Sequence, residues 1–126
     1  MILIGLGSNM SGPWGSPREA VERAIEELNR APLQLLKTSE LIDTDPFGKT
    51  DQPRFVNAVA SIKTKLIPED LLQHLHSIEK SAGRERLERW GPRTLDLDIV
   101  DYNGLVLNTQ TLELPHPGIV ERIFVL

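Results

Sequence analysis

Apolar and acidic residues alternate along residues 95–100, and this pattern constrains the fold more than any other feature of the sequence. The stretch reads Leu-Asp-Leu-Asp-Ile-Val. Successive side chains of a β-strand point to opposite faces, so Asp96 and Asp98 share one face while the apolar residues share the other. Two steps along a strand separate the carboxylates by roughly 7 Å, close enough to hold one or two hard cations between them. The pattern therefore predicts a strand with one buried face and one acidic, open face.

Basic residues and a tryptophan directly precede this strand. Arg89, Trp90 and Arg93 surround a Gly-Pro turn, and Arg84 and Arg86 extend the basic cluster upstream. Guanidinium groups grip phosphate oxygens and carboxylates hold Mg²⁺, so the cluster and the two acids are the parts that a phosphoryl-transfer site needs. The whole chain nevertheless carries a net charge of −4. That charge argues against a general nucleic-acid or membrane-surface binder and favours a local anion site on an acidic protein.

Length and composition set the broad class of the protein. With 126 residues the chain is long enough for one hydrophobic core but not for two, so we expect a single domain spanning residues 1–126. It contains no cysteine, which excludes disulfides and thiolate metal sites and predicts a cytoplasmic location. The apolar start, residues 1–7, is too short for a membrane span and lacks the basic lead of a signal peptide, so it predicts a buried strand.

Hydrophobic periodicity predicts the element order β-α-β-β-α-β. Ser16 and Glu19 form a capping box with proline at the first helical position, and Pro68 begins a second helix. This order is typical of an α+β, ferredoxin-like fold, an antiparallel sheet with both helices on one face. Asn103-Gly104 predicts a tight turn, followed by a short C-terminal hairpin. The predicted elements are strands at 2–7, 33–43, 54–66 and 95–102, helices at 17–30 and from 68 to a stop at 83, and a hairpin pair near 105–107 and 111–114.

The face of the sheet that the helices leave uncovered is the predicted binding floor. If the helices cover the apolar faces of the strands, Phe55 and Asn57 of one strand should project from the opposite face. Asp96 and Asp98 should project from that face as well. Polar and aromatic side chains gathered on an open sheet face are typical of a ligand site.

From Arg89 to Ile99 the sequence resembles the signature of 6-hydroxymethyl-7,8-dihydropterin pyrophosphokinases, enzymes of folate biosynthesis. The match is nearly continuous over this stretch, and it is supported in the same order by Gly7-Ser8-Asn9, Asp51-Gln52-Pro53 and Pro115-His116. The chain ends at Leu126, where members of the family usually continue, so we expect a short form lacking the usual C-terminal segment. The resemblance implies transfer of pyrophosphate from ATP to 6-hydroxymethyl-7,8-dihydropterin, giving AMP and the pterin diphosphate.

The resemblance also implies which residues form the site. Asp96 and Asp98 are expected to bind two Mg²⁺ ions that bridge the triphosphate, and Arg84 and Arg93 are expected to close on the phosphates. These four residues form the expected catalytic set. The nucleotide is expected to contact His76, Glu79, Arg86, Arg89, Arg93, Ile99, His116 and Arg122. The pterin is expected to contact Thr44, Pro46, Phe47, Phe55, Asn57, Trp90, Asp96 and Phe124.

Departures from the family pattern keep a second function open. Phe55 stands in place of a pocket tyrosine, His76 in place of a glutamine and Pro117 in place of a tyrosine. The alternative is a non-catalytic module that binds a pterin or a nucleotide; the intact acids and arginines favour the enzyme. An RNA-binding sheet would need a basic, aromatic-rich strand face, which Asp96 and Asp98 do not provide. We therefore expect ATP and the pterin as partners, no nucleic acid or membrane, and a monomer rather than a dimer.

Overall fold

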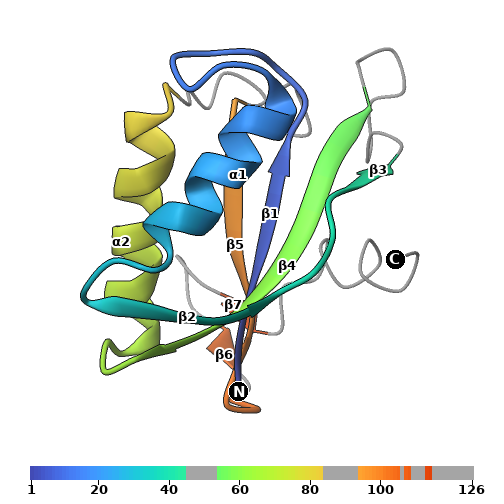
Figure 1. Cartoon of the computed structure of the whole chain (residues 1–126). Helices are drawn as coiled ribbons and strands as arrows, with labels where there is room; N and C mark the ends of the chain where they lie inside the picture. Colours follow the sequence, from blue (N-terminus) through green and yellow to red (C-terminus); the bar gives the residue numbers. More distant parts are fainter. Residues whose placement is uncertain (45–53, 84–93, 106, 109–112, 115–126) are drawn as a thin grey trace.

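The computed structural model of the protein describes residues 1–44, 54–83, 94–105, 107–108 and 113–114 (Figure 1). An antiparallel sheet with strand order β2-β4-β1-β5 forms one layer, and β3 pairs with β4 along the same edge as β2, nearer the start of β4. Both helices lie on the same side of this sheet (Figure 1), which confirms the predicted α+β, ferredoxin-like fold. The elements are β1 (Ile2–Ser8), α1 (Pro17–Glu27), β2 (Leu33–Thr38), β3 (Ile42–Thr44), β4 (Phe55–Thr64), α2 (Pro68–Ser81), β5 (Asp96–Tyr102), β6 (Leu107–Asn108) and β7 (Glu113–Leu114).

Helix α1 begins at the predicted capping box. The Ser16 hydroxyl accepts from the Glu19 amide at 3.3 Å, and the Glu19 carboxylate accepts from the Ser16 amide at 3.1 Å. These two bonds satisfy amide groups that have no partner inside the helix. The helix ends at Glu27, three residues before the predicted end at 30, because the chain changes to a tighter turn. In that turn the amides of Asn29 and Arg30 donate to carbonyl groups three residues earlier.

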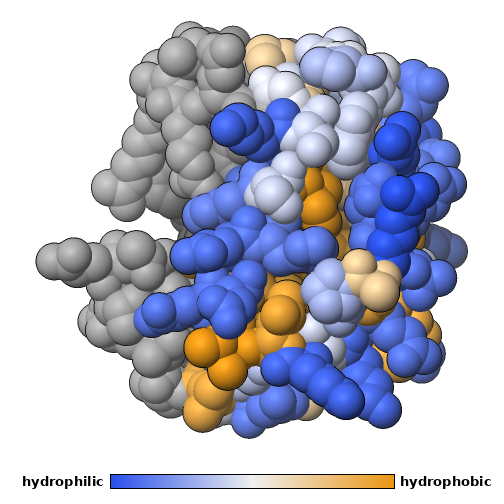
Figure 2. Space-filling model, turned by 90° about the vertical axis from the view of Figure 1, so that its left-hand side faces the viewer, coloured by the Kyte–Doolittle hydropathy of each residue, from blue (hydrophilic) through white to orange (hydrophobic). Residues whose placement is uncertain are grey.

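Helix α2 turns an apolar stripe toward the sheet and a polar surface outward. Leu71, Leu75 and Ile78 are buried against the core. Figure 2 views the molecule from the side on which α2 lies in Figure 1; hydrophilic residues cover most of the described surface, and apolar residues show over a smaller area. This division is the one expected for an amphipathic helix packed on a sheet. Neither α1 nor α2, the helices of the described residues, is long and apolar enough to cross a membrane.

The predicted strand at 33–43 is interrupted, and this part of the prediction was wrong. Residues 39–41 separate β2 from β3, although both strands pair with β4. At the interruption the Ser39 amide donates to the Val59 carbonyl at 2.8 Å, and the Ser39 hydroxyl accepts from the Val59 amide at 2.9 Å. A serine side chain thus takes the place of a backbone group in the ladder, which a hydrophobic pattern cannot reveal.

Strand β1 lies inside the sheet and provides the middle of the core. Leu6 is flanked by Ala58 of β4 and Leu97 of β5, and each of the three is 1% exposed. These residues belong to the cluster packed beneath the helices. Because side chains alternate along a strand, the neighbours of Leu6 on β1, Gly5 and Gly7, face the uncovered side of the sheet.

A tight turn follows β5 as predicted. Asn103 and Gly104 both have positive φ, 54° and 76°, and the Leu105 amide donates to the Tyr102 carbonyl at 3.0 Å. The amino group of Met1 donates to the Asn103 side chain at 2.7 Å, so the turn also holds the start of the chain. Strands β6 and β7 pair with each other, but the residues between them lie outside the described part, so the C-terminal hairpin stays a prediction.

Candidate active site

The two acids of β5 lie on the uncovered face of the sheet, as the alternation predicts. Asp96 is in register with Gly7 of β1, and Asp98 is in register with Gly5. Both acids are half-buried. Because both partners on β1 are glycines, no β1 side chain stands beside the acids on this face. The Gly-x-Gly spacing of β1 is the signal in the sequence that could have predicted this bare backbone.

A single row of residues crosses three strands at this point. Gly7 pairs with Asp96 on one side and with Asn57 of β4 on the other. An acidic group and a carboxamide group therefore flank a position that carries only backbone. The structure thus brings together residues that are 39 positions apart in the chain, one from the predicted metal pair and one from the predicted pterin set.

Asn57 is held in the protein by one end of its amide group. Its Nδ2 donates to the hydroxyl of Thr44, and Asn57 is only 3% exposed. Its Oδ1 is buried and has no hydrogen-bond partner among the described residues. A buried acceptor without a donor costs about 1–3 kcal/mol. A ligand with an N–H group at this position would remove that penalty.

Gly7 makes the close approach of Asn57 possible. A Cβ atom at residue 7 would lie 2.8 Å from Asn57 Oδ1 and 3.5 Å from Phe55 Cδ1. Phe55, also predicted to bind the pterin, is 2% exposed. The predicted pterin residues Thr44, Phe55 and Asn57 are therefore gathered at one end of β3 and β4, around the bare backbone of residue 7.

The start of β5 is fixed by the end of β1. The Ser8 hydroxyl donates to the Thr94 carbonyl at 2.7 Å, and both residues are buried. A Cβ at Gly12 would lie 2.7 Å from Thr94 Cγ2, so the loop after β1 packs closely against the same residue. Ser8 belongs to the Gly-Ser-Asn segment that resembled the family, and the sequence alone gave it no function.

Glu79 of α2 reaches β5 directly. Its carboxylate accepts from the Leu97 amide at 2.7 Å, although Glu79 is only 3% exposed. His76, one helical turn earlier, is exposed. The side chain of Ile99 is 1% exposed and belongs to the core. Of the residues predicted for the nucleotide, these three are described, and they lie on α2 and β5.

The other predicted site residues lie outside the described part of the chain. They are Arg84, Arg86, Arg89, Trp90, Arg93, Pro46, Phe47, His116, Arg122 and Phe124. Within the described ranges, no group of three or more histidine, aspartate or glutamate side chains could hold a metal ion. Two carboxylates on one open face do fit Mg²⁺, which takes few protein ligands and completes its shell with water and phosphate oxygens.

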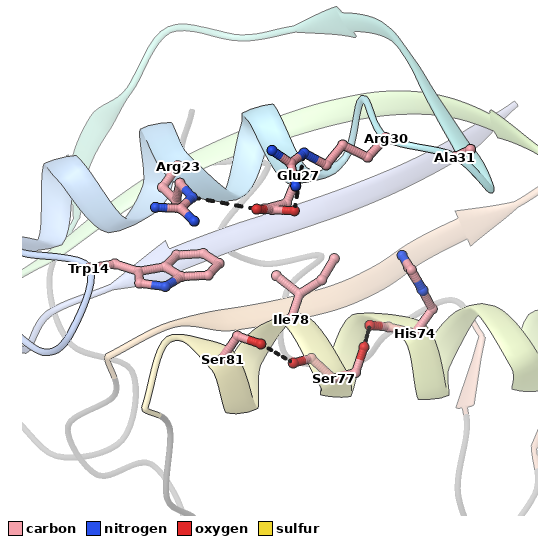
Figure 3. A pocket seen from close by; sticks show the side chains of 9 residues that line it. All are labelled: Trp14, Arg23, Glu27, Arg30, Ala31, His74, Ser77, Ile78 and Ser81. Atoms are coloured by element: carbon pink, nitrogen blue, oxygen red, sulfur yellow. Dashed lines mark hydrogen bonds and ion pairs between the residues drawn. The ribbon is translucent and has the colours of Figure 1, made fainter.

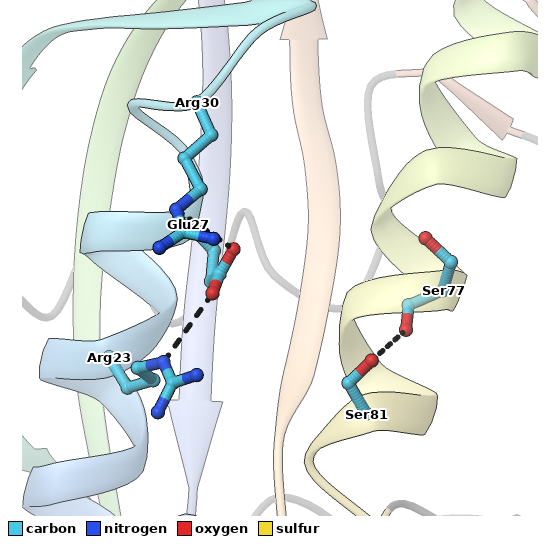
Figure 4. Close-up of polar contacts among 5 residues, drawn as sticks. All are labelled: Arg23, Glu27, Arg30, Ser77 and Ser81. Carbon is cyan, nitrogen blue, oxygen red and sulfur yellow. Dashed lines mark hydrogen bonds and ion pairs between the residues drawn. The ribbon is translucent and has the colours of Figure 1, made fainter.

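A groove lies between the two helices, on the side of the sheet opposite the two acids. Figure 3 shows this groove, which has a volume of about 340 Å³ and is lined by Trp14, Arg23, Glu27, Arg30, Ala31, His74, Ser77, Ile78 and Ser81. Glu27 pairs with Arg23 at 3.4 Å and with Arg30 at 3.7 Å (Figure 4). The Arg23 guanidinium lies 4.8 Å from the centre of the Trp14 ring. None of the predicted site residues that the structure describes lines the groove.

Comparisons with known proteins show which family the chain belongs to. The family model for 7,8-dihydro-6-hydroxymethylpterin-pyrophosphokinase matches residues 3–126. A 2-amino-4-hydroxy-6-hydroxymethyldihydropteridine pyrophosphokinase of Pseudomonas aeruginosa is 44% identical over 126 residues, covering 99% of this chain and 75% of the relative. The protein of the same name from Haemophilus influenzae is 43% identical, covering 98% of this chain and 75% of the relative. The folic acid synthesis protein fol1 of Pneumocystis carinii is 42% identical and covers 99% of this chain but 16% of that protein. The chain therefore belongs to the 7,8-dihydro-6-hydroxymethylpterin-pyrophosphokinase family.

Proposed function

We propose that this protein transfers pyrophosphate from ATP to 6-hydroxymethyl-7,8-dihydropterin, giving AMP and the pterin diphosphate in folate synthesis. The family match along nearly the whole chain and the names of the relatives support this activity. The observation that carries the proposal is the row Asn57–Gly7–Asp96, which sets a carboxamide and an acid on either side of bare backbone. Such a row offers one end to a flat heterocycle and the other to a charged phosphate chain.

The pterin end of the site is proposed to be Asn57 with Phe55 and Thr44. Asn57 Oδ1 is the acceptor for an N–H group of the ring, because it is buried and lacks a donor among the described residues. Thr44 holds the other end of the amide and so fixes which atom is offered. Phe55 supplies an aromatic surface next to it. The contacts predicted for Pro46, Phe47, Trp90 and Phe124 complete this part of the proposal.

The phosphate end is proposed to be Asp96 and Asp98, which would hold the two Mg²⁺ ions implied by the family resemblance. Magnesium, when bound, neutralises phosphate charge and fixes the direction of transfer. The protein contributes a rigid strand that keeps both carboxylates on one face. The four arginines between residues 84 and 93, together with His116 and Arg122, are proposed to contact the phosphates or the nucleotide. The site then acts by positioning and electrostatics.

The nucleotide is proposed to lie against α2 and β5. Glu79 and His76 lie on α2, with Ile99 on the neighbouring strand. Because the Ile99 side chain is buried in the core, its contact with a nucleotide would be made by backbone atoms. We further propose that residues 1–126 act as one domain, as a monomer in the cytoplasm, with small-molecule partners and neither nucleic acid nor membrane.

An assay of AMP release tests this function. The protein, ATP, Mg²⁺ and the reduced pterin should yield AMP only when all are present. Asp98→Asn should reduce AMP release to background, because one of the two metal-binding carboxylates is gone. Asp101→Asn is the matched control, since Asp101 lies on the same strand and its side chain accepts from the Gly104 amide at 3.0 Å, a bond that asparagine can also make. Binding of both substrates without AMP release by the native chain would instead establish the non-catalytic module.

A further inference from the structure

Leu97, the residue between the two acids, has an unusual partner for a strand residue. Its amide donates to a side-chain carboxylate, that of Glu79, at 2.7 Å. Both residues are buried, at 1% and 3% exposure, and they are separated by 18 positions in the chain. A distance of 2.7 Å lies at the short end of the range for an N–H···O hydrogen bond. The bond is therefore a specific connection between α2 and the strand of the metal pair.

The direction of the Leu97 amide determines the direction in which the neighbouring amides of β5 point. Backbone amides of an antiparallel strand alternate between its two edges. Since the Leu97 amide points to Glu79, the amides of Asp96 and Asp98 point to β1, where their register partners are Gly7 and Gly5. Strand β5 ends the strand order of the described sheet. Glu79 thus satisfies a backbone donor on the outer edge, while β1 holds the inner edge.

We infer that Glu79 is a positioning residue for the metal pair. By holding the Leu97 amide, its carboxylate prevents β5 from twisting or slipping at that residue and so keeps Asp96 and Asp98 on one face with constant spacing. This role differs from a nucleotide contact, because it acts through the backbone between the two acids. It rests on the proposed function, in which these acids bind divalent cations.

A purely structural role for Glu79 makes different predictions. Burial of a carboxylate requires hydrogen bonds, and a simple edge cap would contribute to the free energy of unfolding alone. A positioning role predicts weaker binding of the metal by a protein that is still folded. Partners that orient the groups around a metal commonly change its affinity by 10- to 100-fold when they are removed.

Binding of Mn²⁺ alone, without nucleotide and followed by electron paramagnetic resonance, is the direct test. Glu79→Ala should weaken Mn²⁺ binding by about tenfold and remove the exchange protection of the Leu97 amide. Glu79→Gln should keep most of both, because the amide oxygen of glutamine can still accept the bond. In AMP-release assays, Glu79→Ala should raise the Mg²⁺ requirement more than it lowers the rate at saturating Mg²⁺.

The matched control is Ile78→Ala, a neighbouring buried residue of α2 with 7% exposure. This change should lower the stability of the fold but leave Mn²⁺ binding unaffected below the unfolding transition. Unchanged Mn²⁺ affinity in Glu79→Ala would overturn the inference and leave the proposed function intact. If the native protein and Asp96→Asn/Asp98→Asn bound Mn²⁺ equally well, the proposed metal site itself would fail.

Discussion

Gly7→Ala is the change that most directly tests whether the bare backbone of residue 7 is needed to place Asn57 for pterin binding. The added Cβ would lie 2.8 Å from Asn57 Oδ1, and ordinary contact begins at 3.4 Å, so the oxygen must move by about 0.6 Å. Asn57 cannot move freely, because its other end donates to Thr44 inside the protein. The backbone of residue 7 needs no change, since its φ is not among the positive values of the described residues. The substitution should therefore displace the amide of Asn57 and leave the fold in place.

The expected loss follows from the hydrogen bond that Asn57 Oδ1 is proposed to accept from the pterin. Losing that bond, or distorting it, costs about 1–2 kcal/mol, or roughly 5- to 30-fold in the dissociation constant of the pterin. We expect this loss in titrations of the pterin by fluorescence or calorimetry in the presence of a non-hydrolysable ATP analogue. The affinity for the ATP analogue alone should not change. The unfolding midpoint should fall only slightly, because the lower entropy of the unfolded chain with alanine partly offsets the cost of moving the amide that Thr44 holds.

A double-mutant cycle tests the cause of the loss. In the Asn57→Ala background the oxygen that clashes is absent, so Gly7→Ala should have little further effect on pterin affinity. Gly104→Ala serves as a control with the opposite outcome. Gly104 has a φ of +76° and nothing within 4 Å of its added Cβ, so the change should lower the stability of the fold without weakening pterin binding. An equal loss from Gly7→Ala with or without Asn57 would refute the steric explanation.

Three other predictions concern the ends of elements and the metal. Ser8→Ala removes the hydroxyl that donates to the Thr94 carbonyl at 2.7 Å. In urea unfolding, this change should lower the free energy of unfolding by about 1–3 kcal/mol. A loss below a few tenths of a kcal/mol would show that another donor replaces the hydroxyl. The pKa of Glu19 is lowered by its hydrogen bonds from the backbone and side chain of Ser16, so its ionised form stabilises the fold above the unfolded pKa and this contribution disappears as pH falls through the folded pKa. Glu19→Gln should therefore be less stable than the native protein at pH 7 and equally stable at low pH in urea unfolding; a difference that persists in acid would contradict this assignment. Removal of divalent cations with EDTA should abolish AMP release, and added Mg²⁺ should restore it; turnover that survives EDTA would rule out the proposed role of Asp96 and Asp98.

Features set by neighbouring residues in the chain could be predicted well. The alternation around Asp96 and Asp98 gave the correct faces of β5, and the pair Ser16 and Glu19 gave the correct start of α1. The tight turn at Asn103-Gly104 was also expected, and both residues have positive φ. In each of these cases the deciding interaction joins residues no more than four positions apart, so the pattern in the sequence contains the interaction itself.

Features set by distant residues could not be predicted. The interruption between β2 and β3 depends on Ser39 bonding to Val59, and the bond from Leu97 to Glu79 joins a strand to a helix. No pattern in the sequence around Ser39 or Glu79 reveals such a distant partner. The family resemblance named Glu79 without giving its orientation. The residues predicted to carry most of the phosphate contacts lie outside the described part, so those roles remain predictions.

The two glycines that leave the face of β1 open lower the stability of that strand, and the buried residues of β1 offset this loss. Each glycine inside a strand costs roughly 0.5–1 kcal/mol relative to alanine, so Gly5 and Gly7 together cost about 1–2 kcal/mol. On the opposite face of the same strand, Ile4 and Leu6 are at most 1% exposed, and each fully buried side chain of this kind contributes about 1.5–3 kcal/mol. Burial beneath the helices therefore exceeds the loss, and a strand inside the sheet can leave backbone bare at Gly5 and Gly7, where the substrates are proposed to bind.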